Sequence, residues 1–206
     1  MNEPQQTPPP LKGRLTAMSE TSWNTLVNAH RATAPGPVTR PPNHEPKAAI
    51  LACSDARVPP SVIFDQPAGN LFVIRIAGNT AVPSALASLD YAVASLDVDL
   101  IVVLGHTSCG AVGAAVAGTC GGHLAPVVSS ICEIAKARPD ATPDEISALN
   151  VAATVQALVD HDGPVGQAAR AGNVEIRGAV HDLVTGELIP VTTPTPTQSL
   201  IALEAS

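Results

Sequence analysis

The sequence predicts an α/β fold: a mostly parallel central sheet flanked by helices, with an antiparallel edge strand and an N-terminal helical arm. Two observations lead to this fold class. Several apolar runs lack the alternation of half-exposed strands, and stretches with helical character separate them. Strands that are covered on both faces give such continuous apolar runs, and alternation of strand and helix is typical of parallel sheets with right-handed crossovers.

Each element follows from a local pattern. The strands are expected at residues 48–52, 71–77, 100–104 and 174–180. Helices are expected between them, at residues 84–96, 109–117, 127–137 and 143–159. The last helix has the clearest start, because Thr142-Pro143-Asp144-Glu145 forms a capping box with proline at the first helical position. Thr185-Gly186 predicts the turn of a final hairpin, which supplies the antiparallel edge.

The two ends of the chain differ in composition from its middle. Nine of the 20 prolines lie in residues 1–46, which we expect to form an arm with a short helix around residues 19–31. One face of that helix carries apolar side chains for which another subunit is a candidate partner: Trp23, Leu26, Val27 and His30. Residues 47–191 are expected to form one α/β domain, and residues 192–206 an extended tail.

Composition excludes several classes of function. The chain has 206 residues, of which 45% are hydrophobic, and a net charge of −7, so it lacks the basic surface that nucleic acids require. No apolar run approaches the ~18 residues of a membrane span, and the N-terminus does not look like a signal peptide. We therefore expect a cytoplasmic protein. In a reducing compartment its four cysteines would stay free and available to a metal.

Two short segments at expected strand ends carry candidate metal ligands. Cys53 follows the first apolar run, and His106 and Cys109 follow the third. Ligands of open parallel sheets bind beyond the carboxyl ends of the strands, where the strand order reverses. If these two strands are neighbours there, Cys53 approaches His106, and a tight turn brings Cys109 to the same point. Two thiolates and one imidazole suit a catalytic zinc ion, one per chain, with a fourth position open to water.

Asp55 and Arg57 follow the first candidate ligand at two and four residues. The carboxylate can accept a hydrogen bond from a metal-bound water, while the guanidinium keeps it ionised. Taken singly, each of these residues has an ordinary explanation, since a buried cysteine is a small apolar residue and Asp55–Arg57 is a possible surface pair. Their combination at the strand ends favours a catalytic centre. Gly105 and Gly110 flank the second segment and are expected to allow close approach or positive φ.

These segments resemble those of the β-class carbonic anhydrases, from about residue 48 to residue 191. The resemblance rests on six motifs in one order: Cys53-Ser54-Asp55-Ala56-Arg57-Val58-Pro59, Phe64-Asp65-Gln66, Leu71-Phe72-Val73-Ile74-Arg75, Ala77-Gly78-Asn79, Asp90-Tyr91-Ala92-Val93 and Val103-Leu104-Gly105-His106-Thr107-Ser108-Cys109-Gly110. It implies zinc-dependent, reversible hydration of carbon dioxide to bicarbonate and a proton. Cys53, His106 and Cys109 would then be the zinc ligands, with Asp55 and Arg57 as the catalytic dyad.

The resemblance also implies the surroundings of the site. Phe72 and Tyr91 would line an apolar substrate pocket together with Gly110, and His44 stands where the family commonly has a glutamine that binds substrate. The family forms dimers or multiples of dimers, in which the neighbouring subunit lines part of each active site. A homodimer with a small-molecule substrate and no nucleic-acid or membrane partner is therefore expected.

The chain departs from one branch of the family. That branch has an inhibitory bicarbonate site with a tryptophan and a tyrosine, where this chain has Ile50 and His181 and retains only Arg75. We therefore expect no such site. Two other functions stay open at this stage: hydrolysis of carbonyl sulfide or carbon disulfide on the same scaffold, and non-catalytic binding of zinc or bicarbonate. Cys120, His123 and Cys132 are expected to bind no second metal.

Overall fold

A five-stranded sheet forms the centre of the structure, which is a computed structural model that describes residues 11–33 and 44–192. The strands are β1 (Ala48–Ala52), β2 (Leu71–Arg75), β3 (Leu100–His106), β4 (Glu175–His181) and β5 (Leu188–Val191). Their order is β2-β1-β3-β4-β5, and every neighbouring pair is parallel except β4 and β5. The predicted α/β class, with its mostly parallel sheet and antiparallel edge strand, is confirmed.

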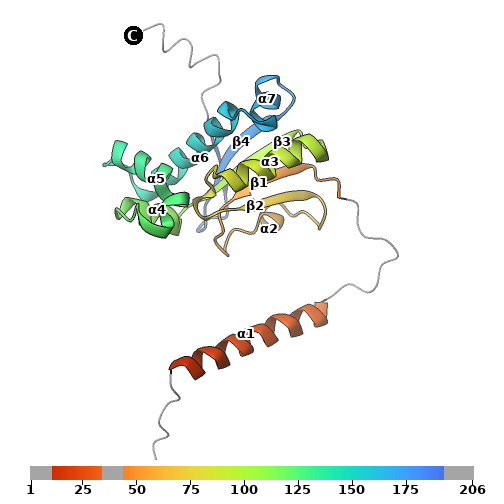
Figure 1. Ribbon diagram of the computed structural model, residues 1–206, viewed down its shortest axis with the longest axis vertical. Helices are drawn as coiled ribbons and strands as arrows, with labels where there is room; N and C mark the ends of the chain where they lie inside the picture. The colour runs from red at the N-terminus through yellow and green to blue at the C-terminus, as the bar shows by residue number, and fades with distance from the viewer. Residues whose placement is uncertain (1–10, 34–43, 193–206) are drawn as a thin grey trace, which may run out of the picture. The chain divides into compact units, whose positions relative to one another are not determined.

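Helices surround this sheet (Figure 1). They are α2 (Pro60–Ile63), α3 (Pro83–Leu96), α4 (Gly110–Val116), α5 (Ala125–Ala137), α6 (Pro143–Asp160) and α7 (Pro164–Arg170), with short 3-10 turns η1 (Ala77–Asn79) and η2 (Gly122–Leu124). The capping box that opens α6 is present as predicted. The sequence patterns missed α2, whose four residues are too few to show a period, and α7, which buries only Val165 and Gly166 and so shows no apolar stripe. Strand β2 ends at Arg75 rather than at residue 77, because the chain turns into η1, where Gly78 has a φ of +75°.

The two faces of the sheet bury different side chains of the same strands. Ala49 and Leu51 of β1 pack in a core with residues of α3 and α6, such as Leu89 and Val155. The alternate residues, Ala48, Ile50 and Ala52, face the other way and pack near Ile63 and Phe64, at the end of α2. Successive side chains of a strand point to opposite faces, so β1 is covered on both sides, as its continuous apolar run predicts.

A third group of buried side chains lies beyond the carboxyl ends of β1 and β3, where Figure 1 shows α4 and α5 together. It joins Cys53 and Cys109 to apolar residues of these two helices, including Val112 and Ile131. The candidate metal ligands are therefore anchored in a packed core rather than in a surface loop.

The N-terminal helix, α1 (Leu11–Thr33), belongs to a separate unit, residues 1–41, and is described by itself. It is longer than the predicted residues 19–31, because no proline occurs between Pro10 and Pro35 to interrupt it. Trp23 and Leu26 are exposed by 66% and 67%. Of the expected C-terminal tail, Thr192 is described and the remaining residues lie outside the described part of the chain.

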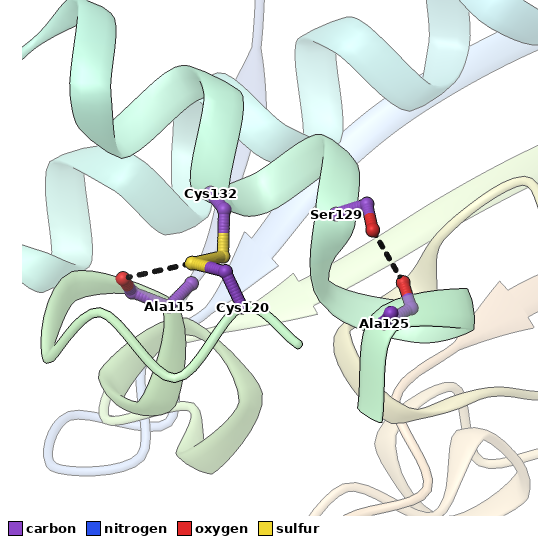
Figure 2. The surroundings of a disulfide bond; sticks show 5 residues. All are labelled: Ala115, Cys120, Ala125, Ser129 and Cys132. Carbon is purple, nitrogen blue, oxygen red and sulfur yellow. Dashed lines mark hydrogen bonds between the residues drawn. A yellow bond between two sulfur atoms is a disulfide. The ribbon is translucent and has the colours of Figure 1, made fainter. Parts of the chain in front are cut away.

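The sequence led us to expect four free cysteines, but two of them are bonded to each other. Cys120 and Cys132 form a disulfide, which joins the loop after α4 to α5 (Figure 2). Only Cys53 and Cys109 are free thiols. The expectation was wrong because spacing along the chain does not reveal that a loop returns Cys120 to the side of α5. Both sulfurs are taken up by this bond.

No helix within residues 11–33 or 44–192 is both long and apolar enough to span a membrane.

Candidate metal centre

The fold brings the two candidate segments together where the strand order reverses. Strands β1 and β3 are parallel neighbours, and Ala52 pairs with Leu104, so Cys53 follows β1 at the level where His106 ends β3. Strand β2 lies on one side of this pair and β4 on the other, so the chain leaves β1 and β3 in opposite directions. The predicted switch point is confirmed, and its two loops meet there.

Cys53, His106 and Cys109 offer three ligand atoms that converge. These atoms all lie within 4.8 Å of one another, the three side chains are buried, and the two Sγ atoms are 3.9 Å apart. His106 Nδ1 lies 2.9 Å from the carbonyl oxygen of Thr107, to which it donates as the neutral tautomer. Its Nε2 is buried without any hydrogen-bond partner. A buried nitrogen that faces two thiols and lacks a partner fits a metal ligand whose other nitrogen is held by a carbonyl group.

The pKa values of the two thiols are shifted in opposite directions. A hydrogen bond from Cys109 is the main reason that the pKa of Cys53 falls to about 4, and His106 and the Gly78 N–H, 3.4 Å from Sγ, add to it against burial. The pKa of Cys109 is raised, mainly because its proton is held by Cys53. Cys53 is thus the more acidic thiol of the pair, and Cys109 is the one that holds its proton more tightly. A divalent ion would favour loss of the second proton, and two thiolates with a neutral imidazole form a donor set that suits zinc.

Asp55 and Arg57 form the predicted pair beside this cluster. Asp55 Oδ2 accepts a hydrogen bond from Arg57 Nη2 at 2.7 Å, and Oδ1 accepts from Nε and from the Arg57 backbone N–H, both at 2.9 Å. These bonds from Arg57 hold the pKa of Asp55 well below its usual value. Oδ2 is also 3.9 Å from His106 Nε2. A permanently charged acceptor therefore lies next to the point where the three ligand atoms converge.

Two residues for which the sequence predicted no contact with the first ligand loop hold that loop in place. Arg75, at the end of β2, donates from Nε to the Cys53 carbonyl oxygen at 2.9 Å and from Nη2 to the carbonyl oxygen of Asp55. Its guanidinium is thus committed to the loop. Gly78 cannot be replaced without strain, because a Cβ there would lie 2.6 Å from Ile131 Cδ1 and φ is +75°. Glycine at this position therefore allows the backbone N–H to approach the Cys53 sulfur.

The second ligand loop differs from the prediction in its glycines. Gly105 allows close approach, since a Cβ there would lie 2.5 Å from Val151 Cγ2, but its φ is not positive. Gly110 begins α4 directly after Cys109, and a Cβ there would meet nothing within 4 Å. The residue with positive φ is Ser108, at 54°. The expectation for Gly110 was wrong because the reversal is completed one residue before Cys109.

Three of the four predicted substrate residues come together, but not beside the metal ligands of the same chain, whereas Gly110 directly follows Cys109. His44 and Tyr91 flank Phe72, each with a ring centroid 6.1 Å from that of Phe72. Phe72 pairs with Ala49, four residues before Cys53, and is therefore separated from it by about 13 Å along the strands. Tyr91 is 51% exposed. This aromatic row lies at the free edge of the sheet, on β2 and its neighbours.

Four cavities among the described residues are lined by residues other than Cys53, His106 and Cys109. A cavity of about 690 Å³ lies between α6, α7 and the β4–β5 edge, and it includes none of the predicted site residues. The residues at the positions of the family branch's inhibitory bicarbonate site have other surroundings here. Ile50 is buried in the core, and Arg75 donates hydrogen bonds to the first ligand loop. His181 pairs with His106 in the sheet and has a buried Nδ1 without a hydrogen-bond partner.

Comparisons with known proteins agree with this geometry. Residues 48–188 match the family model described as carbonic anhydrase. A relative from Mycobacterium tuberculosis, named carbonic anhydrase 2, is 38% identical over 153 residues, which are 70% of this chain and 74% of the relative. A carbonic anhydrase from Pseudomonas aeruginosa is 36% identical over 161 residues, or 69% of this chain and 72% of that protein.

Solved structures extend the likeness to most of the chain. A tetrameric β-carbonic anhydrase from Sordaria macrospora has a TM-score of 0.70 and 25% identity, and the match covers 89% of this chain and 99% of that one. The β-carbonic anhydrase CafA of Aspergillus fumigatus has the same TM-score and identity, with 93% and 96% covered. With its family match, its ligand cluster and its sheet order, this chain belongs to the β-class carbonic anhydrases and is a carbonate dehydratase, a lyase.

Proposed function

We propose that the chain hydrates carbon dioxide reversibly to bicarbonate and a proton with one zinc ion, held by Cys53, His106 and Cys109. The convergence of these three ligand atoms within 4.8 Å supports this assignment most directly. Zinc bound by three protein ligands leaves a fourth position for water and makes hydroxide available near neutral pH.

Asp55 and Arg57 orient the attacking water in this proposal. Oδ2 of Asp55 accepts the hydrogen that the attacking oxygen still carries, which directs an oxygen lone pair toward carbon dioxide. Arg57 keeps Asp55 ionised through the hydrogen bonds at 2.7 and 2.9 Å, so Asp55 does not carry the product proton away. That proton leaves through water, buffer or a histidine at the edge of the site. Arg75 fixes the backbone of the loop from which Asp55 projects.

The aromatic row of His44, Phe72 and Tyr91 is assigned to the site of a partner subunit. Within one chain it lies about 13 Å along the strands from Cys53, yet Tyr91 is half exposed and β2 is an edge strand. A homodimer, or a multiple of dimers, places this row against the metal centre of a second chain. Gly110, directly after Cys109, would line the same pocket from the ligand side.

The test combines metal content with catalysis. Wild-type protein is expected to contain about one zinc ion per chain and to hydrate carbon dioxide in a stopped-flow assay. Cys109→Ala should lose most of both, because the ligand set falls to two. Val112→Ala is the matched control, since it truncates a buried neighbour of Cys109 that offers no ligand atom and leaves the Cys120–Cys132 disulfide intact.

Full zinc content in Cys109→Ala would refute the ligand assignment. Carbonyl sulfide and carbon disulfide are assayed with the same samples, and faster turnover of either than of carbon dioxide would overturn the substrate assignment.

A further inference from the structure

The loop between the second and third ligands contains a residue with an unfavourable backbone conformation, and a side chain from another part of the chain hydrogen-bonds to that residue. Ser108 stands between His106 and Cys109 with a φ of +54°, a region that residues with a Cβ rarely adopt. Its N–H donates to Asp144 Oδ1 at 2.7 Å, from the first turn of α6. A bond of this length to a carboxylate is charge-assisted and stronger than one between neutral groups.

The other end of the same residue contacts the dyad. The carbonyl oxygen of Ser108 accepts a hydrogen bond from Arg57 Nη2 at 3.1 Å, and the same nitrogen donates to Asp55 at 2.7 Å. A continuous line of hydrogen bonds therefore runs from Asp144 through the backbone of Ser108 to Arg57 and Asp55. Rotation of the Ser108 backbone would move the third ligand and the support of Arg57 together.

Asp144 is not needed to cap its own helix. Thr142 and Glu145 already form the capping box of α6, with Thr142 Oγ1 accepting from the Glu145 N–H and the Glu145 carboxylate accepting from the Thr142 N–H at 2.7 Å. The Asp144 carboxylate instead reaches across to a loop 36 residues earlier in the chain. Two carboxylates thus stand side by side in one helical turn, and one of them contacts the ligand loop.

We propose that Asp144 is a positioning residue for the reaction: it holds Ser108 in the left-handed conformation that places Cys109 at the metal and Arg57 against Asp55. The inference rests on the proposed zinc site. Asp144 accepts a hydrogen bond from the backbone of Ser108 and acts through it.

Four variants separate this role from helix stability. Asp144→Ala removes the acceptor, Asp144→Asn keeps a neutral acceptor, and Glu145→Ala breaks the capping box in the same turn without touching Ser108. The double variant Asp144→Ala/Ser108→Gly replaces the strained residue with one that adopts positive φ freely. Zinc release to a chromophoric chelator is measured for each zinc-loaded protein, together with the thermal midpoint and the visible spectrum of the cobalt-substituted form.

Asp144→Ala is expected to release zinc about 10-fold faster or more, in line with the loss of other outer contacts that orient metal ligands. Its cobalt spectrum should change. Asp144→Asn should lie between Asp144→Ala and wild type, and Ser108→Gly should restore slow release to the Ala variant. Glu145→Ala should release zinc at the wild-type rate even if its thermal midpoint falls.

Wild-type release from Asp144→Ala would overturn the proposal, as would equal acceleration in Glu145→Ala. If Asp144→Ala does not fold, the other two variants decide. The proposal is overturned if Asp144→Asn releases zinc as slowly as wild type and if Asp144→Ala/Ser108→Gly still releases it fast or does not fold. A wild-type protein that binds no zinc at all would instead refute the proposed function, so the two failures are distinguishable.

Discussion

Arg57 keeps the Asp55 carboxyl group ionised, and it does so by lowering the pKa of that group. The hydrogen bonds from Arg57 hold the pKa of Asp55 in the folded protein below the ordinary value of about 3.9. A lowered pKa means that the pair stabilises the fold above the ordinary value, and that this contribution is lost as the pH falls from there through the folded-state pKa. Asp55 is therefore charged throughout the neutral range in which the reaction is expected to run.

Replacement of Arg57 by alanine should return the pKa of Asp55 toward about 4, because both side-chain hydrogen bonds to the carboxylate are lost. Carboxyl NMR titration of the metal-free protein measures this, because the charge of a bound zinc ion would itself lower the pKa. At pH 4 the wild-type carboxylate stays ionised and that of the variant is about half protonated. Hydration activity should fall by at least 10-fold even at neutral pH, since the carboxylate is no longer oriented.

Arg177→Ala serves as the control for that measurement. Arg177 is exposed and pairs with Glu175 on β4, so its removal changes the net charge equally without touching Asp55. An unchanged Asp55 titration in Arg57→Ala would show that the pair does not set the charge of Asp55.

The sequence predicted which side chains form the metal cluster, because residue type and position at strand ends are both written in it. Cys53, His106 and Cys109 converge as expected. It did not reveal the contacts that depend on exact backbone geometry. Asp144 was indistinguishable from an ordinary acidic residue at a helix start, and nothing in the chain marks Ser108 as the residue with positive φ.

Among the elements, α4 and α5 are linked by the one covalent bond between distant segments that the described residues contain. The disulfide from Cys120 to Cys132 fastens the loop after α4 to α5 (Figure 2). Helix α4 has seven residues, no side-chain cap, and begins next to Cys109. Because such a short helix is marginal by itself, its position depends on packing and on this bond.

Loss of the disulfide should lower the free energy of unfolding by about 3 kcal/mol, the loop-closure entropy for a separation of 12 residues. The zinc-loaded double variant Cys120→Ala/Cys132→Ala should therefore melt several degrees below wild type in calorimetry. A phosphine reductant should lower the wild-type midpoint by a similar amount.

The same reductant added to the double variant gives the control, in which no shift is expected. A wild-type protein whose melting is indifferent to reductant, and equal to that of the double variant, would show that the bond does not stabilise the fold.

The elements also show where sequence patterns suffice. The four parallel strands follow from apolar runs, and the start of α6 follows from its capping box. Helix α2 was missed because four residues cannot show a period, and α7 because only Val165 and Gly166 of its seven residues are buried. The disulfide was missed because Cys120 and Cys132 meet only through tertiary packing.

At the scale of the whole molecule, the sheet ends at β2 on one side and at β5 on the other. The order of the strands could be inferred only in part from the sequence: the neighbouring positions of β1 and β3 were a condition for the metal site, and the structure fulfils it. How two chains meet is not written in a single-chain pattern of apolar runs, because an edge strand and a buried strand look alike in it.

The row of His44, Phe72 and Tyr91 on the β2 side, far along the strands from Cys53, has a consequence for kinetics. If each site needs this row from a second chain, an isolated chain turns over little substrate. The initial rate should then rise linearly with protein concentration while the dimer persists, and with the square of concentration once dilution has separated the subunits.

Stopped-flow rates measured over a dilution series, with sedimentation velocity on the same samples, locate the change of order. Chains crosslinked as dimers before dilution should stay linear throughout. A rate that remains first-order down to concentrations at which sedimentation shows only monomers would mean that one chain suffices for catalysis.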